Sequence, residues 1–239
     1  MVIVHYAPAL AAATLPRAPR LGPLFIAAQL VEITFFLLAL AGVEHYALEP
    51  FYTAMSPFYV YEAPWTHSLI GALGLAAGFA VVVRLAGGGK NAAWIGAAVV
   101  VSSWFLDLLL HAPDLTLAGG VRRYGLGLWN HAYVAMPLEL GLTLVALTFY
   151  ANRTRARDWR GNAALVLLTV AMLAFQLADW LRAQPGEAID PAPAAVSLSG
   201  LAAYTILTVF AWWTASTRAL PAATATGTLA AEPAEGAAP

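Results

Sequence analysis

The chain contains no cysteine, which excludes disulfide bonds and thiolate metal ligands. Any metal site must therefore use imidazole and carboxylate groups. Charge is also scarce, because Asp, Glu, Lys and Arg make up only 10% of the 239 residues and the formal net charge is −1. Without a basic excess there is no general attraction to nucleic acid, and we expect no nucleic-acid partner. The N-terminus lacks a signal-peptide pattern, so we expect insertion through the transmembrane helices themselves.

Apolar residues dominate instead: 61% of the chain is hydrophobic and the mean hydropathy is +0.71. This composition predicts an all-α, polytopic transmembrane helical bundle that forms a single domain over residues 1–220. Apolar runs long enough to cross a bilayer cover residues 21–43, 66–85, 92–111, 131–150, 162–181 and 195–217. Residues 1–15 are apolar but short. They either cross, which gives about seven helices and is the arrangement we favour, or lie along the inner surface, which leaves six.

The basic residues predict the orientation of this bundle. With alternating spans, nine of the twelve Lys and Arg residues fall on one side: Arg17, Arg20, Arg84, Lys90, Arg153, Arg155, Arg157, Arg160 and Arg218. The side richer in basic residues is expected to be cytoplasmic, which suits a multi-pass protein of the inner cell membrane. The acidic, aromatic-rich loop at residues 44–65 then faces outward, as an interfacial aromatic belt or as a lid. Residues 221–239 are rich in Ala, Pro, Gly and Glu, and we expect a disordered tail.

One apolar run ends in a polar pair, Asp107 and His111, within the stretch SSWFLDLLLHAPD. A spacing of four residues places both side chains on one face of a helix, about one turn apart. An ionised carboxylate inside a bilayer costs roughly 2.5–3.5 kcal/mol, so a partner must offset it. A hydrogen-bonded structural Asp with an interfacial His explains the pair as well as a metal or proton site does.

Three further residues fall at comparable depth. A rise of about 1.5 Å per residue from the nearest basic residue places His5 and Glu32 roughly 18 Å into the membrane and His67 roughly 25 Å. The same count places Asp107 at roughly 25 Å and His111 at roughly 31 Å. We therefore expect the five groups to meet in the outer half of the bilayer. The competing explanations are a protonated, hydrogen-bonded Glu32, and a His67 that lies among the headgroups where Thr-His-Ser begins a helix.

Two more carboxylates, Glu139 and Asp179, are candidates for catalytic or supporting roles. Glu139 counts to roughly 21 Å from Arg153, but no His or Asp lies three or four residues from it. Asp179 lies near the outer end of its span, where pairing with Arg182 three residues on explains it equally well. Either carboxylate would orient a metal-bound His or act as a general base.

Three stretches resemble the membrane-bound metal-dependent hydrolase family, also described as LexA-binding inner-membrane hydrolases. They are HYAPAL from His5 followed by the helix that carries Glu32, the PWTHSL motif around His67, and SSWFLDLLLHAPDLTL running on to GLGLWN. The likeness covers roughly residues 1–150. It implies a helical membrane protein that holds a divalent metal through His and acidic residues. The family is also distantly similar to the all-helical zinc phospholipase C and P1 nuclease group, which hydrolyse phosphoesters.

These observations lead to three functional hypotheses. In the first, His5, Glu32, His67, Asp107 and His111 hold zinc or manganese, which activates water to hydrolyse a lipid headgroup or another phosphoester, with membrane lipid as the natural partner. In the second, the same groups relay metal ions or protons in a transporter, although the inner half of the bundle offers few polar residues. In the third, the protein is noncatalytic and the polar residues fix helix packing.

Overall fold

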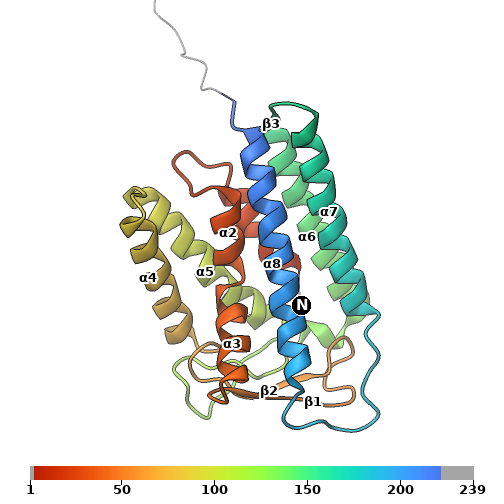
Figure 1. Ribbon diagram of the computed structural model, residues 1–239. Helices are drawn as coiled ribbons and strands as arrows, with labels where there is room; N and C mark the ends of the chain where they lie inside the picture. Colours follow the sequence, from red (N-terminus) through yellow and green to blue (C-terminus); the bar gives the residue numbers. More distant parts are fainter. Residues whose placement is uncertain (1–2, 222–239) are drawn as a thin grey trace, which may run out of the picture.

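The computed structural model describes residues 3–221, and Figure 1 shows that they form a helical bundle with small strand pairs at its ends. The N-terminal half contains η1 (Ile3–His5), α1 (Tyr6–Ala12), α2 (Leu21–Ala28), α3 (Leu30–Leu40), β1 (His45–Leu48), β2 (Phe58–Glu62) and α4 (Leu69–Leu85). The C-terminal half contains α5 (Lys90–Leu110), η2 (Leu128–Asn130), α6 (Ala132–Arg153), β3 (Arg155–Ala156), α7 (Trp159–Trp180), α8 (Ala194–Thr217) and β4 (Arg218–Ala219). The expected all-α bundle is confirmed. Most of the expected tail, from residue 222 on, lies outside the described residues.

Length and composition identify the membrane-crossing helices. Within residues 3–221, α5, α6, α7 and α8 are long and apolar enough to cross a bilayer, and α2 with α3 adds a fifth span if the bent pair is counted as one. The helix α4 has 17 residues and is shorter. These four to five apolar helices make the chain a membrane protein.

The expected single helix over residues 21–43 is broken, because α2 and α3 meet at Gln29 with a bend of 55°. The Ser103 hydroxyl of α5 donates a hydrogen bond to the Ala28 carbonyl at the break (2.7 Å). A carbonyl released from a helix inside a bilayer needs such a partner, since no water is available there. The break turns the first residues of α3, including Glu32, toward the interior of the bundle near α4 and α5.

The N-terminal segment does not lie on the bundle surface. Ile3, Tyr6 and Leu10 are fully buried among α2, α5 and α6, and Tyr6 stacks on Phe25 of α2 with ring centroids 4.3 Å apart. Ten residues of helix extend only about 15 Å, which is half of the roughly 30 Å hydrocarbon thickness. The segment is therefore an inserted half-length helix, and it carries His5 to the middle of the bundle.

The two ends of the bundle differ in charge. At the basic end Arg218 of β4 is buried, and it lines a cavity together with Arg17, Arg20 and Arg157. At the opposite end, the segment expected to be a loop at residues 44–65 folds into an antiparallel hairpin of β1 and β2, visible beneath α3 and α8 in Figure 1. Tyr59 and Tyr61 of β2 contact each other, and Phe58 stacks on Tyr46 of β1, so aromatic pairs favour strands over an open loop.

Candidate functional site

Asp107 lies at the centre of the site, near the last turn of α5, and is 1% exposed. Its Oδ1 atom is 2.9 Å from Nε2 of His5 and 3.4 Å from Nε2 of His111. The i,i+4 spacing brings His111 and Asp107 together as expected, although His111 itself is the residue at which the helix ends. His5 reaches the same carboxylate because η1 packs against α5.

Glu32 and His67 form the second half of the cluster. Glu32 Oε1, in the first turn of α3, is 3.7 Å from Nε2 of His67. The His67 and His111 rings lie 6.0 Å apart, so the two halves adjoin. His67 is only 2% exposed, so its ring faces protein rather than lipid headgroups, while the neighbouring Ser68 caps α4 by accepting a hydrogen bond from the Gly71 amide. The structure thus brings together all five side chains that the sequence placed in the outer half of the bilayer.

A buried carboxylate behind His67 fixes the orientation of its ring. Glu44 is fully buried and accepts hydrogen bonds from the Trp65 and Thr66 amides and from the Thr66 hydroxyl. Because the hydroxyl proton goes to Glu44, the Thr66 oxygen is left to accept a bond from Nδ1–H of His67, 3.0 Å away. This assigns the proton to Nδ1 and leaves the Nε2 lone pair facing Glu32 and the cluster.

Asp114 does the same for His111. Its Oδ1 is 3.2 Å from Nδ1 of His111, and the ring packs on Trp129 with centroids 4.5 Å apart. The carboxylates of Asp114 and Asp107 thus lie on either side of the His111 ring, against Nδ1 and Nε2 respectively.

The cluster borders a small cavity of about 50 Å³. Polar groups of His5, Glu32, His67 and His111 line one side, and Phe58 and Val60 of the β-hairpin line another. About 30 Å³ is the volume of one water in the liquid, so this space holds one or two waters and no organic substrate. The hairpin therefore lies between the cluster and the adjacent end of the bundle.

Glu139 lies next to the cluster without lining its cavity. Trp129 donates a hydrogen bond from Nε1 to Glu139 Oε1 (2.8 Å), and Gln176 donates from Nε2 to Oε2 (3.1 Å). Both carboxylate oxygens are thus occupied, and Oε1 holds Trp129, which packs on His111. Asp179 pairs with Arg182 at 3.4 Å, as its spacing predicted. A very small second cavity joins Glu139 to Asp179, and Trp129 lines both cavities.

The donor set at the centre of the cluster includes buried polar atoms without partners. Both ring nitrogens of His5 and both oxygens of Asp107 are buried without a hydrogen bond, although Nε2 of His5 and Oδ1 of Asp107 are only 2.9 Å apart. Such unsatisfied atoms are uncommon in native proteins and mark functional or ion-binding places. Even so, among residues 3–221 no group of three His, Asp or Glu side chains has the geometry to coordinate one ion. The chemistry of the donors fits a divalent cation, while their positions require side-chain rearrangement to bind one.

Sequence reasoning missed three members of the site: Glu44, Thr66 and Asp114. Glu44 lies in the segment expected to be an aromatic loop, and only the hairpin brings it beneath the start of α4. Thr66 begins the span expected over residues 66–85, and its contact with Glu44 depends on the same hairpin. Asp114 offered a signal, because it follows His111 by three residues in the motif HAPD.

Comparison of the chain with protein-family models, with curated proteins and with solved structures gives no match. Fold and site together define the class of the protein as a polytopic helical membrane protein. Its distinguishing feature is a buried cluster of three histidines and two carboxylates beneath a β-hairpin.

Proposed function

We propose that this protein is a metal-dependent hydrolase of the inner cell membrane, acting on a phosphoester or lipid-like substrate near the outer face. The observation that carries the proposal is the pairing of His5 with Asp107. Both are buried at the centre of a cluster of imidazoles and carboxylates, and neither has a hydrogen bond for the atoms that face the other. A divalent cation would satisfy these atoms and offset two carboxylate charges at once.

In this proposal His5, His67, Asp107 and His111 hold the ion, with Glu32 as a further donor. Imidazole and carboxylate ligands suit zinc or manganese. The chemistry that such an ion would supply here is an activated water near neutral pH and polarisation of a phosphoryl oxygen. Binding requires the 2.9 Å His5–Asp107 contact to open so that both residues turn toward the ion.

The surrounding residues orient the ligands. Thr66 holds His67 with its Nε2 lone pair toward the cluster, and Asp114 holds His111 through Nδ1. Groups that orient ligands in this way strengthen metal binding by 10–100-fold. Glu139 acts as a positioning residue through Trp129, since both of its oxygens accept hydrogen bonds and it does not border the cavity of the cluster. Asp179 takes a supporting place beside it.

Substrate access depends on the hairpin in this proposal. The cavity of about 50 Å³ admits water alone, and Phe58 and Val60 cover it. The hairpin is tied to the α7–α8 loop by the bond from the Tyr61 hydroxyl to Asp190 (2.7 Å) and by backbone pairing of Leu48 with Ile189. Movement of β1 and β2 away from α3 would expose the cluster to the outer membrane surface.

A noncatalytic role is the second candidate, and a specific observation favours it. Each carboxylate of the cluster already lies within 4 Å of an imidazole, so protonated histidines can neutralise the charges without a metal. The cluster would then lock η1, α3, α4 and α5 together by hydrogen bonding and charge.

Metal analysis of the purified full-length chain decides between the two candidates. We expect about one equivalent of zinc or manganese in the unaltered protein, loss of that metal in Asp107→Ala and His67→Ala, and retention in the control His131→Ala, whose side chain is exposed. Hydrolysis of bis(p-nitrophenyl) phosphate should follow the metal. A metal-free unaltered protein, with both cluster variants merely less stable, would establish the structural role instead.

A further inference from the structure

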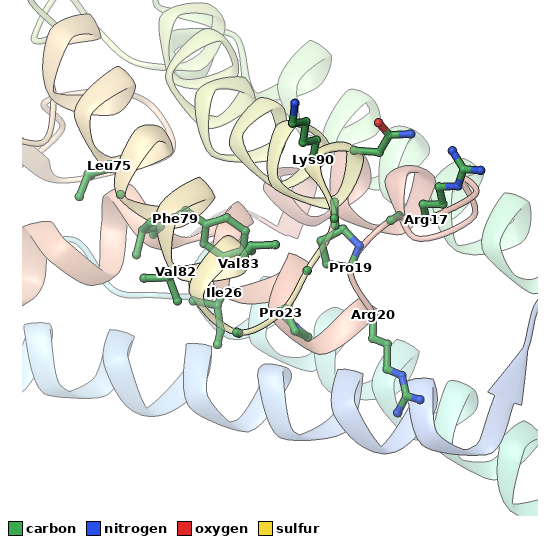
Figure 2. Close-up of a pocket in the computed structure, with 18 of the residues that line it drawn as sticks. Arg17, Pro19, Arg20, Pro23, Ile26, Leu75, Phe79, Val82, Val83 and Lys90 are labelled. Atoms are coloured by element: carbon green, nitrogen blue, oxygen red, sulfur yellow. The ribbon is translucent and has the colours of Figure 1, made fainter.

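A large apolar cleft opens on the side of the bundle, away from the histidine cluster. It measures about 1170 Å³ and runs between α2 and α4, with the turn from α4 to α5 at one end. Figure 2 shows Leu75, Phe79 and Val82 of α4 facing Ile26 of α2 across it. An apolar cleft of this size needs an apolar occupant, and in a membrane protein the surrounding lipid is at hand.

Three cations mark one end of the cleft. Arg17, Arg20 and Lys90 line it beyond Pro19, at the basic end of the bundle (Figure 2). The described lining includes no Asp or Glu, and within residues 3–221 none of the three cations forms an ion pair. Arg17 and Arg20 also line an adjoining cavity with Arg157 and Arg218, which strengthens the positive field. The cleft therefore pairs an apolar slot with an unneutralised cationic end.

The length of the slot matches one leaflet. Along the unbroken helix α4, the residues that line the cleft run from Gly74 to Val83, which is nine residues or about 14 Å of helix. Half of the roughly 30 Å hydrocarbon core is a similar distance. An acyl chain that enters from the leaflet at the basic end would fill the slot while its phosphate stays at the level of the three cations.

We propose that this cleft is a binding site for one anionic glycerophospholipid of the leaflet at the basic end. Arg17, Arg20 and Lys90 bind its phosphate and anionic headgroup, and an acyl chain lies between α2 and α4. A zwitterionic lipid fits the slot equally well, but the positive charge of its headgroup opposes the three cations. The site is separate from the histidine cluster, so it stands or falls independently of the proposed hydrolase.

Two glycines leave the room that the acyl chain takes. A Cβ atom added to Gly74 or Gly78 of α4 would meet no other atom within 4 Å, and both residues line the cleft. Larger side chains there occupy the slot without displacing backbone, and replacing glycine favours the helix. Gly141 of α6 is equally open but lies outside the cleft, so it provides a matched control.

Native mass spectrometry of the full-length protein in detergent, with palmitoyl-oleoyl phosphatidylglycerol or phosphatidylcholine added, tests the proposal. We expect one tightly retained phosphatidylglycerol on the unaltered protein. The triple variant Arg17→Gln, Arg20→Gln, Lys90→Gln should lower the preference for phosphatidylglycerol by at least about tenfold. Gly78→Phe should weaken retention of both lipids.

Two controls make the result decisive. The triple variant Arg153→Gln, Arg155→Gln, Arg160→Gln removes the same charge from the same end of the bundle, at exposed residues outside the cleft, and should keep the preference. Gly141→Phe should retain lipid as the unaltered protein does. Equal losses in the two charge variants, or unchanged retention in a folded Gly78→Phe and in a second variant, Gly74→Phe, would overturn the proposal.

Discussion

Replacing Arg218 with alanine is expected to lower the free energy of unfolding by roughly 3 kcal/mol or more. The Arg218 guanidinium is buried at the basic end, where it donates hydrogen bonds to the Ala151, Thr154 and Gly161 carbonyls. It also donates to the Thr154 hydroxyl and the Asn162 side chain. One side chain thus satisfies the carboxyl-terminal end of α6 and ties it to the start of α7, and alanine would leave these buried acceptors unpaired.

The charge of Arg218 needs no carboxylate partner there, because α6 and α8 both end beside it and the negative ends of their dipoles face the cation. Thermal unfolding in detergent measures the effect. Arg218→Lys keeps the charge but loses the planar fork, so it should fall between alanine and the unaltered protein. Arg153→Ala is the control, since Arg153 is exposed and its guanidinium lies over the face of the Phe149 ring. A similar drop in both alanine variants would show that Arg218 stabilises only through general charge.

Hydropathy was sufficient to predict the fold class, because α5 to α8 are long apolar runs and such runs must be helical in a bilayer. It could not predict the break at Gln29. No proline or glycine marks that position, and the carbonyl released at Ala28 is satisfied by Ser103, which is 75 residues away in sequence. The β1–β2 hairpin was not predicted for a related reason. Its strands pair residues that are separated in sequence, and a pattern of apolar runs carries no information on such pairing.

The site was predictable where it depended on depth. Counting helical rise brought His5, Glu32, His67, Asp107 and His111 into the outer half of the bilayer, and the structure places them in one cluster. Four of them line its cavity, and Asp107 contacts His5 and His111 behind it. The metal and the hydrolase activity stay predictions. The residues behind the cluster were not predictable in this way, because Glu44 and Asp114 lie in irregular segments whose path the helices do not determine.

The hydroxyl of Thr66 gives the sharpest test of those residues. Thr66→Val keeps the shape of the side chain but removes the oxygen that joins Glu44 to Nδ1 of His67. Without it the proton is free to move to Nε2, the atom that faces the cluster, and Glu44 loses one of its three donors. If His67 is a metal ligand, we expect zinc affinity to fall by about 10–100-fold, as it does when groups that orient a ligand are removed.

Competition with a zinc chelator measures that affinity, and thermal unfolding of the same samples measures stability. Thr66→Ser restores the hydroxyl and should restore zinc binding, because Glu44 and Nδ1 of His67 both regain their partner. A loss of stability with unchanged zinc affinity would mean that the Glu44–Thr66–His67 chain only holds the hairpin to α4. If the hydroxyl fixes the tautomer, we expect zinc affinity and stability to fall in Thr66→Val and to recover in Thr66→Ser. The hydroxyl is the group that serine shares with threonine and valine lacks, so recovery would identify it as the cause.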